Sequence, residues 1–341
     1  MRAVVYQKTG DSSVLEVVDR EVAEPHWGEV RVRIAVAGVN PTDWKSRSGA
    51  TGPAALPFDE IVPGQDGAGV VDAVGNGVTG VSQGDRVWLY LAQHQRPTGT
   101  AQEYAVVPAE RAVRLGTASY DIGASLGVPA MTAHRALTVH EDGPTRLSPG
   151  ALEGRTVLVS GGAGAVGHAA IQLAAWAGAR VITTISSDEK ARLAAAAGAH
   201  HVVNYRAGDP AAEIKAIAPD GVDLVVEVAL AENADLVAGV LTPRGAVSAY
   251  ADSGKKLTVP VRPLMVLNAR LQFILLYTVG ADALAAAAED VSAAVADGAL
   301  GVGEEYGLPL LRFPLEQTAA AHDAVEKGAV GKVLIDIAEL D

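Results

Sequence analysis

The chain has 341 residues, which is long for a single core and suits two domains. Its formal net charge of −13 argues against nucleic acid or an anionic membrane as a partner. There is no cysteine, which excludes disulfides, thiolate catalysis and thiolate-bound zinc. The chain begins with a strand-like run rather than a signal peptide, and no apolar run is long enough to span a bilayer, so we expect a cytoplasmic protein.

The first part of the chain is predicted to be mostly β-structure. Residues 30–36 alternate charged and apolar side chains, as a half-buried strand does. Further short strands are expected at residues 1–6, 67–74, 86–91 and 99–107, with glycine-containing turns between several of them. Many short strands with glycine turns are typical of a partly open barrel or a sandwich.

After residue 124 the pattern changes to alternating helices and strands. A helix is expected at 126–139, followed by a loop rich in Gly, Pro and Thr. The expected strands are 156–160, 180–185, 201–204, 222–228 and 245–249, and the expected helices between them are 165–177, 188–197, 210–218 and 233–241. This alternation predicts a doubly wound parallel sheet with right-handed crossovers.

The last part of the chain is predicted to complete both domains. Its expected elements are an apolar strand at 273–277, an Ala-rich helix at 281–297, a helix at 315–327 and a strand at 331–337. The predicted fold class is therefore α/β, with a mostly-β domain at 1–123 that residues 300–341 complete, and a Rossmann domain at 124–299. The strand at 273–277 is expected to be an uncovered edge, which invites pairing with a second copy.

A glycine-rich turn joins the expected strand 156–160 to the helix that follows it. The turn runs from Gly161 to Gly167, and a backbone without Cβ atoms lets a pyrophosphate approach the free N–H groups of the helix N-terminus. Gly167 would allow close packing of the helix on the strand. The residues predicted to bind a dinucleotide here are Ala163, Gly164, Ala165 and Val166. A structural glycine turn is the competing interpretation.

The end of the second strand distinguishes NADH from NADPH. An NADH site usually has an acidic residue there, which binds the ribose 2′-hydroxyl. Here Ser186 and Ser187 are small donors suited to a 2′-phosphate, and Lys190 supplies positive charge one helical turn later. Asp188 points the other way, but we expect it to cap the next helix. The residues favour NADPH.

Several motifs along the chain resemble those of a known superfamily. The motifs that carry the resemblance are Gly38–Lys45, Pro63–Val71, Gly84–Val87, Gly99–Tyr104, Pro129–Ala133, the glycine turn and Gly331–Val333. In this order and spacing they are similar to the zinc-free branch of the medium-chain dehydrogenase/reductase superfamily, in particular its NADPH:quinone oxidoreductase (zeta-crystallin-like) group. The resemblance covers nearly the whole chain.

The resemblance implies a GroES-like first domain, a Rossmann second domain, an active site between them and a homodimer. Zinc-dependent relatives have a cysteine where this chain has Asn40, and a histidine–glutamate pair where it has Gln65 and Asp66. No metal site is therefore expected. Asp43 is interpreted as a structural residue that pairs with Lys332.

The resemblance also implies individual site residues. Asn40 and Thr132 match positions near the nicotinamide, although Asn40 is equally well explained by loop geometry. Lys45 stands where many relatives have tyrosine, and it gives the site a basic group. The catalytic candidates are thus Asn40, Lys45 and Thr132. Further cofactor-binding positions implied by the match are Tyr205, Ser248, Tyr250, Leu275 and Tyr277.

These observations predict an NADPH-dependent, zinc-independent oxidoreductase that delivers hydride to a quinone or an α,β-unsaturated carbonyl. Without a metal the protein must act on an acceptor that is already electrophilic. An enoyl-thioester reductase is a rival, but its usual catalytic tyrosine is missing from residues 46–58. A tailoring reductase of secondary metabolism and a non-catalytic NADPH-binding sensor stay open.

Overall fold

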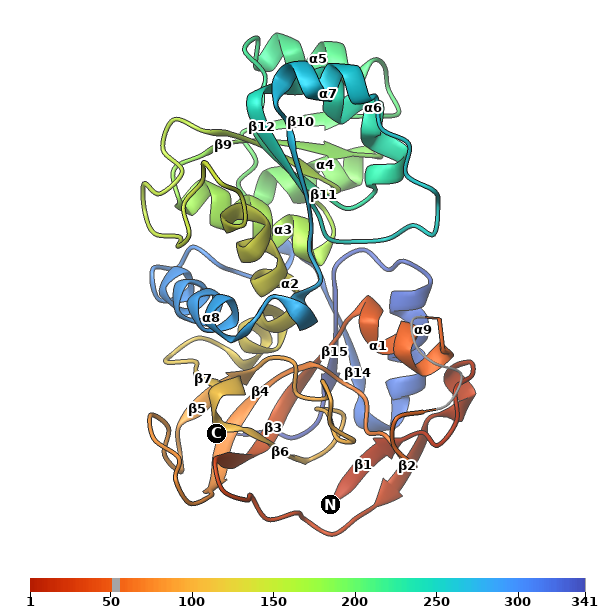
Figure 1. Cartoon of the computed structure of the whole chain (residues 1–341). Coiled ribbons are helices and arrows are strands. Elements are labelled where there is room, and N and C mark those ends of the chain that lie inside the picture. Colours follow the sequence, from red (N-terminus) through yellow and green to blue (C-terminus); the bar gives the residue numbers. More distant parts are fainter. Residues whose placement is uncertain (51–55, 341) are drawn as a thin grey trace. The chain divides into compact units, whose positions relative to one another are not determined.

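The chain folds into two compact units. The computed structural model describes residues 1–50 and 56–340 (Figure 1). One unit consists of Met1–Val128 and the stretch that begins at Leu310, and the other consists of Pro129–Pro309. We predicted domain boundaries after residues 123 and 299, and the two compact units divide after residues 128 and 309. The domain boundaries themselves stay a prediction.

The first unit is built on a mostly antiparallel sheet. Its strands are β3 (Glu29–Val39), β4 (Asp66–Val74), β5 (Arg86–Leu89), β6 (Tyr104–Pro108), β7 (Ala112–Arg114), β14 (Leu310–Pro314) and β15 (Lys332–Asp336). The strand order is β14-β15-β3-β4-β5-β7, and β6 also pairs with β3. Only β14 and β15 are parallel among these described pairs.

Smaller elements accompany this sheet. They are the paired strands β1 (Arg2–Val5) and β2 (Glu16–Asp19), the helices α1 (Pro41–Ser48) and α9 (Thr318–Glu326), and 3-10 turns at Ser12–Val14, Ala109–Arg111 and Leu315–Gln317. The alternation expected for residues 30–36 is observed at the start of β3, where Val30, Val32 and Ile34 are buried and Arg33 is exposed. β15 pairs with β3, so the end of the chain contributes a strand to this unit.

The second unit contains a six-stranded sheet in which every described pair is parallel. Its strands are β8 (Thr156–Ser160), β9 (Arg180–Ile185), β10 (His201–Asn204), β11 (Val222–Glu227), β12 (Leu241–Ala249) and β13 (Arg270–Phe273). Their order is β10-β9-β8-β11-β12-β13, so the order reverses between β8 and β11. This is the doubly wound arrangement of dinucleotide-binding domains. The predicted α/β fold class is confirmed.

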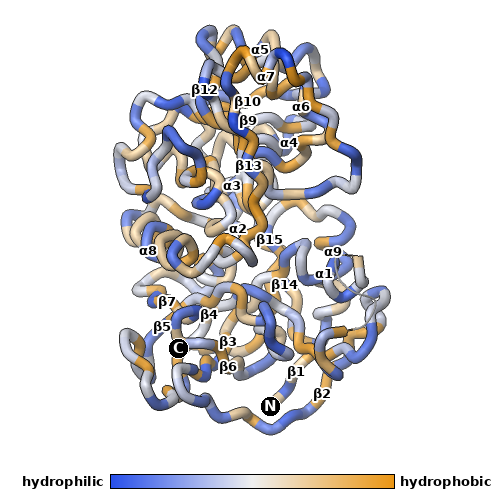
Figure 2. Tube along the Cα trace, viewed as in Figure 1, coloured by the Kyte–Doolittle hydropathy of each residue, from blue (hydrophilic) through white to orange (hydrophobic). Residues whose placement is uncertain are grey.

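Helices connect these strands. They are α2 (Tyr120–Thr138, which begins in the first unit), α3 (Ala165–Trp176), α4 (Asp188–Ala196), α5 (Pro210–Ile217), α6 (Leu230–Val240), α7 (Val261–Leu267) and α8 (Ala281–Ala296), with 3-10 turns at Leu276–Thr278 and Glu304–Tyr306. Hydrophobic residues gather along several of the strands (Figure 2). Within the described part of the chain, no helix is both long and apolar enough to cross a bilayer.

One predicted element is wrong. Residues 273–277 were expected to form a strand, but β13 ends at Phe273 and residues 276–278 form a 3-10 turn. Phe273 and Leu275 are 64% and 58% exposed, as residues of an uncovered edge would be, but only Phe273 of this run belongs to a strand. A short apolar run does not reveal by itself which secondary structure it forms.

Candidate active site

The glycine turn follows β8 directly and leads into α3. A Cβ atom on Gly167 would lie 2.3 Å from the carbonyl oxygen of Gly161, so only glycine lets the helix pack this close to the turn. The N-cap of α3 is Gly164, which has no side chain that could accept a hydrogen bond from the first N–H groups of the helix. The first N–H groups of the 12-residue helix have no partner within the helix and are available to an anion.

The four residues predicted to bind the dinucleotide lie at this helix start. Ala163 is buried, Gly164 is exposed, and Ala165 and Val166 are half-buried. A Cβ atom on Gly164 would meet only the Gly161 carbonyl oxygen, at 3.5 Å, so there is open space above the turn. A space bordered by backbone and a helix N-terminus fits a pyrophosphate.

The residues at the end of β9 are in contact with one another. Lys190 Nζ donates to Ser186 Oγ at 3.4 Å, and the backbone N–H of Lys190 donates to Ser187 Oγ at 3.3 Å. Ser187 is therefore the N-cap of α4, and the expectation that Asp188 caps this helix is wrong. Asp188 is exposed as the first residue of α4. Because β8 and β9 are parallel neighbours, their carboxyl ends lie side by side. Ser186 and Lys190 therefore place a hydroxyl and a positive charge beside the glycine turn.

The other predicted cofactor residues follow the carboxyl ends of the remaining strands. Tyr205 follows β10 and is 47% exposed. Ser248 lies in β12, and its buried Oγ has no hydrogen-bond partner in the described structure. Tyr250 follows β12, while Leu275 and Tyr277 follow β13. In a parallel sheet all of these positions lie at one edge, the same edge as the glycine turn.

A buried carboxylate at this edge, Glu227, was missed from the sequence. It ends β11, is fully buried, and accepts a hydrogen bond from Ser160 Oγ at 2.6 Å. It also accepts bonds from the Ala229 N–H and from Asn233 Nδ2. Burial and the charge of Glu227 raise the pKa of Tyr250 above its usual value. An acidic residue that ends a buried strand is a signal that the sequence did contain.

In the first unit, Asn40 lies in a buried cluster of polar side chains. Its Nδ2 donates to Asp66 Oδ2 at 2.7 Å, and its Oδ1 accepts from Lys332 Nζ at 2.8 Å. Lys332 is also 3.8 Å from Asp66, and both are buried. The predicted partner of Lys332 was Asp43, but Asp43 instead accepts the backbone N–H of Asn40 at 2.7 Å. Burial, together with the charge of Asp66, raises the pKa of Asp43 to about 7.

The other two catalytic candidates lie on helices α1 and α2. Lys45 is half-buried in α1, and its Nζ lies 5.9 Å from the centre of the Trp44 ring. Thr132 is buried in the part of α2 that belongs to the second unit. Across residues 1–50 and 56–340, no group of three or more His, Cys, Asp and Glu side chains is arranged to hold a metal ion.

Two family models match the chain. The alcohol dehydrogenase GroES-like domain matches residues 26–117, and the zinc-binding dehydrogenase model matches residues 165–293. A quinone oxidoreductase from Lama guanicoe is 31% identical over 98% of this chain and 97% of its own length. A 2-haloacrylate reductase from a Burkholderia species is 31% identical over 94% of each chain.

Solved structures of similar proteins have the same fold over their whole length. Escherichia coli quinone oxidoreductase, complexed with NADPH, has 26% identity and a TM-score of 0.79, with 98% of this chain and 100% of that chain covered. An NAD-dependent alcohol dehydrogenase has 28% identity and a TM-score of 0.84, with 99% and 100% covered. The chain is therefore an oxidoreductase of the medium-chain dehydrogenase/reductase superfamily and belongs to its quinone oxidoreductase group.

Proposed function

We propose that this oxidoreductase transfers hydride from NADPH to a quinone or an α,β-unsaturated carbonyl compound, without zinc. The observation that carries the proposal is the contact of Lys190 with Ser186 at the end of β9, the position that reads the 2′ group of the adenosine ribose. A serine hydroxyl and an ammonium group suit a 2′-phosphate, whereas a carboxylate at this position would suit a free 2′-hydroxyl.

NADPH is the cofactor. The glycine turn offers backbone N–H groups and open space for the pyrophosphate, and Ser186 and Lys190 offer donors for the 2′-phosphate. The E. coli relative was solved as a complex with NADPH. The NAD-dependent alcohol dehydrogenase supports the opposite preference. The residues of this chain favour NADPH, because Asp188 is the exposed first residue of α4 and does not lie at the end of β9.

The residues in the first unit do not fit a catalytic zinc ion. The chain has no cysteine, and the positions that carry zinc ligands in related enzymes have the amides Asn40 and Gln65. The remaining carboxylate, Asp66, is already paired with the ammonium group of Lys332. A bound dication beside a buried ammonium group would be strongly repelled. The zinc-binding name of the matching family model therefore does not carry over to this chain in our proposal.

When bound, NADPH supplies a hydride. The task of the protein is to hold an acceptor that already attracts electrons and to stabilise the oxygen on which charge develops. Asn40 has two amide hydrogens and donates one to Asp66, which leaves the second for a substrate oxygen. The 2-haloacrylate named for one relative is itself an alkene conjugated to a carboxylate, which agrees with an activated acceptor.

Steady-state assays with NADPH test this function. We expect turnover with a simple 1,4-quinone or an enone, and none with a primary alcohol and NADP+. Faster turnover of a crotonyl thioester than of any quinone would favour an enoyl-thioester reductase. Tight NADPH binding without turnover on the whole panel would favour a sensor. Activity that dialysis against a chelator abolishes, and zinc restores, would contradict the zinc-independent chemistry.

We also propose a homodimer formed through the free edge of β13. This strand ends the sheet order, and Phe273 and Leu275 are exposed beside it. The exposed apolar residues of α7 are Val261, Met265 and Val266, each at least 61% exposed. An unpaired strand edge with exposed apolar side chains is suited to pairing with a second copy. The cytoplasmic location expected from the sequence stays a prediction.

A further inference from the structure

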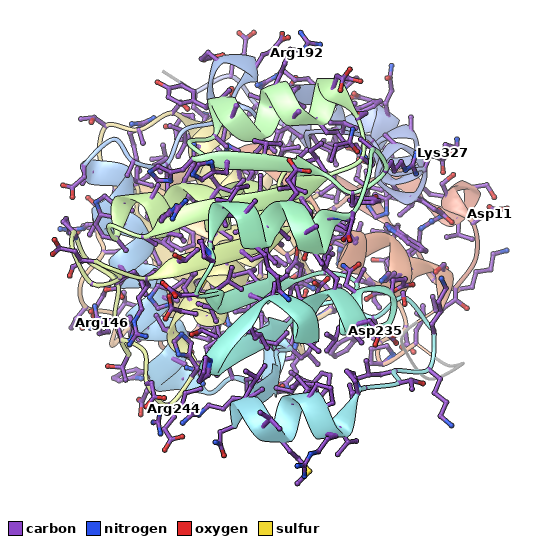
Figure 3. All side chains as sticks on the ribbon, turned by 90° about the horizontal axis from the view of Figure 1, so that it is seen from above. Asp11, Arg146, Arg192, Asp235, Arg244 and Lys327 are labelled. Atoms are coloured by element: carbon purple, nitrogen blue, oxygen red, sulfur yellow. The ribbon has the colours of Figure 1, made fainter. Side chains whose placement is uncertain are left out.

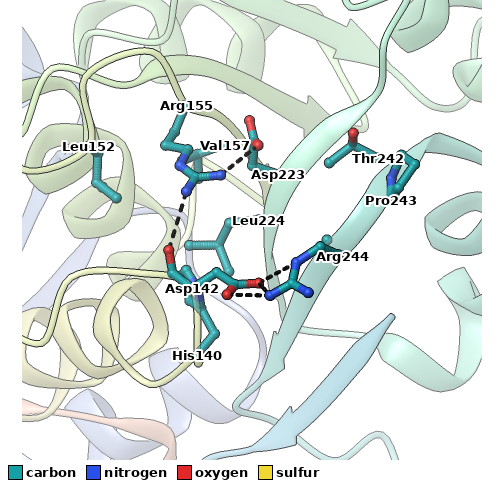
Figure 4. Close-up of a pocket in the computed structure, with 11 residues that line it drawn as sticks. His140, Asp142, Leu152, Arg155, Val157, Asp223, Leu224, Thr242, Pro243 and Arg244 are labelled. Carbon is teal, nitrogen blue, oxygen red and sulfur yellow. Dashed lines mark hydrogen bonds and ion pairs between the residues drawn. The ribbon is translucent and has the colours of Figure 1, made fainter. Parts of the chain in front are cut away.

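The second unit contains a cavity at the opposite edge of its sheet from the glycine turn. The cavity has a volume of about 380 Å³ and lies at the amino ends of β8, β11 and β12 (Figure 4). The lining is mostly polar, from His140, Asp142, Arg155, Asp223, Thr242 and Arg244, and its apolar part comes from Leu152, Val157, Leu224 and Pro243. A cavity of several hundred Å³ is large enough for a small molecule.

A bulge in β12 shapes one wall of this cavity. Val222 in β11 pairs with Leu241, but Leu224 pairs with Ala246, so residues 242–245 bulge out opposite a single residue of β11. Arg244 lies in this bulge with a φ of 67°, in the left-handed region that arginine rarely adopts. Strained backbone of this kind is found preferentially at ligand-binding sites, because the surrounding structure must hold it in place.

Three guanidinium groups converge on Asp142 at the cavity. Arg244 binds the carboxylate with Nη2 to Oδ1 at 2.6 Å and Nε to Oδ2 at 3.1 Å. Arg270 Nη1 is 3.1 Å from Oδ2, and Arg155 Nη2 donates to the backbone oxygen of Asp142 at 3.2 Å. Such clusters of arginine are the usual way in which proteins bind carboxylates and phosphates.

We propose that this cavity is a second ligand site, which binds a small molecule with a carboxylate or phosphate group on an apolar body, and that the Asp142 carboxylate occupies the oxyanion position when no ligand is present. The anionic group of the ligand replaces Asp142 at Arg244, and the apolar body lies against Pro243, the exposed apolar residue of the lining. The proposal does not depend on the proposed function, because it uses the opposite ends of the strands.

Arg155 and His140 complete the polar part of the site. Arg155 Nη1 pairs with Asp223 at 3.0 Å, and this pair holds the guanidinium at the cavity wall (Figure 4). His140 lines the same cavity, and its buried Nε2 has no hydrogen-bond partner in the described residues. A buried polar atom without a partner costs free energy that a ligand or an ordered water would recover.

Calorimetric titration of the full chain with benzoate, phenyl phosphate and inorganic phosphate tests this site. The protein is first saturated with NADPH and kept at constant ionic strength, so that phosphate cannot report binding at Ser186 and Lys190. We expect benzoate or phenyl phosphate to bind more tightly than inorganic phosphate, which lacks an apolar body. Benzoate against phenyl phosphate separates a carboxylate from a phosphate ligand.

Two substitutions give opposite expected results. Arg244→Gln removes a guanidinium and is expected to weaken binding about tenfold or more, since hydrogen bonds to charged groups are strong. Asp142→Asn removes the competing carboxylate and is expected to tighten binding. Arg155→Gln is a second variant in case Arg244→Gln fails to fold. The matched controls are Arg33→Gln on the exposed face of β3 and Asp235→Asn on the exposed face of α6, which make the same charge changes elsewhere.

The controls make the result decisive. If Arg33→Gln weakens binding as much as Arg244→Gln, or Asp235→Asn tightens it as much as Asp142→Asn, the ligand responds to net charge alone and the site is overturned. If none of the three probes binds the NADPH-saturated wild-type protein at millimolar concentration, the site is also overturned. If binding is lost on NADPH saturation, the anion occupied the cofactor site and the cavity is not the ligand site.

Discussion

Lys332 Nζ donates a hydrogen bond to Asn40 Oδ1 at 2.8 Å across 292 positions of the chain, and both side chains are buried. The same ammonium group lies 3.8 Å from Asp66, which accepts a hydrogen bond from Asn40 Nδ2. Lysine and aspartate together therefore fix which way the Asn40 amide faces. The interpretation of Asn40 as a residue of loop geometry and its interpretation as a substrate contact are compatible, because the cluster holds the loop and orients the amide.

Replacing Lys332 by methionine should destabilise the protein strongly. The substitution leaves the buried Asp66 carboxylate without its cation, and breaking a buried pair in this way costs about 3–5 kcal/mol. The measurement is the free energy of unfolding in urea. Lys327→Met is the matched control, because the Lys327 side chain is 76% exposed, and it should change the free energy by less than about 0.5 kcal/mol. Equal losses in both variants would show that the cluster does not stabilise the fold.

Two glycine-to-alanine substitutions should have opposite effects. Gly167→Ala places a Cβ atom 2.3 Å from a backbone oxygen, so the glycine turn must shift; we expect a loss of about 3 kcal/mol in stability and weaker NADPH binding. Gly239→Ala lies in α6 with nothing within 4 Å of the new atom, and it should stabilise the protein by about 0.5 kcal/mol. Thermal unfolding and NADPH fluorescence titration measure both effects. Unchanged NADPH affinity in Gly167→Ala would contradict the proposed pyrophosphate site.

Lys190→Gln should change cofactor preference. The variant loses the ammonium group at the end of β9, so we expect the dissociation constant for NADPH to rise about tenfold while that for NADH stays the same. Arg192→Gln is the control on the same helix, because Arg192 is exposed (Figure 3). A loss of NADH affinity as large as the loss of NADPH affinity would mean that Lys190 does not read the 2′-phosphate.

His168 should make the protein sensitive to acid. Its Nε2 bonds the Tyr306 carbonyl oxygen at 2.8 Å, and burial lowers its pKa to about 4. Histidine in the unfolded chain has a pKa of about 6.5 and binds a proton there that His168 in the folded chain does not bind. The contribution of His168 to stability is therefore fully present above about pH 6.5 and is lost as the pH falls toward 4. At pH 5 the loss amounts to about 2 kcal/mol.

Urea titrations at pH 7 and pH 5 measure this dependence. His168→Gln keeps a donor for the Tyr306 oxygen but cannot titrate, so its stability should fall less between the two pH values than that of the wild type. His26→Gln changes an exposed histidine and should keep the wild-type pH dependence. A His168→Gln variant with the wild-type dependence would mean that other groups cause the loss.

Phe273→Glu should separate the proposed dimer. The side chain is 64% exposed at the free edge of β13, and a charge there opposes strand pairing between copies. Light scattering at micromolar concentration should give a dimer for the wild type and a monomer for the variant. Val22→Glu, at a partly exposed apolar residue of the first unit, is the control and should remain a dimer. A monomeric wild type would remove the dimer from the proposal.

The sequence by itself determined the second unit almost completely. The strands 156–160, 180–185 and 201–204 have the predicted bounds, because each contains adjacent β-branched residues and is bounded by glycine and polar turns. The glycine turn and the Ser186–Lys190 segment were recognisable for the same reason, since their chemistry is local. The run 273–277 was wrongly predicted to be a strand, because a short apolar composition does not distinguish a strand from a 3-10 turn.

Only the tertiary structure decided which distant side chains meet. The sequence paired Lys332 with Asp43, but the packing of β15 on β3 brings Lys332 to Asn40 and Asp66 instead. The tertiary structure also places Glu227 against Ser160, and three arginines around Asp142. Local patterns encode periodicity and turns, whereas the partner of a buried charge depends on strand register and order, which no short stretch of sequence contains.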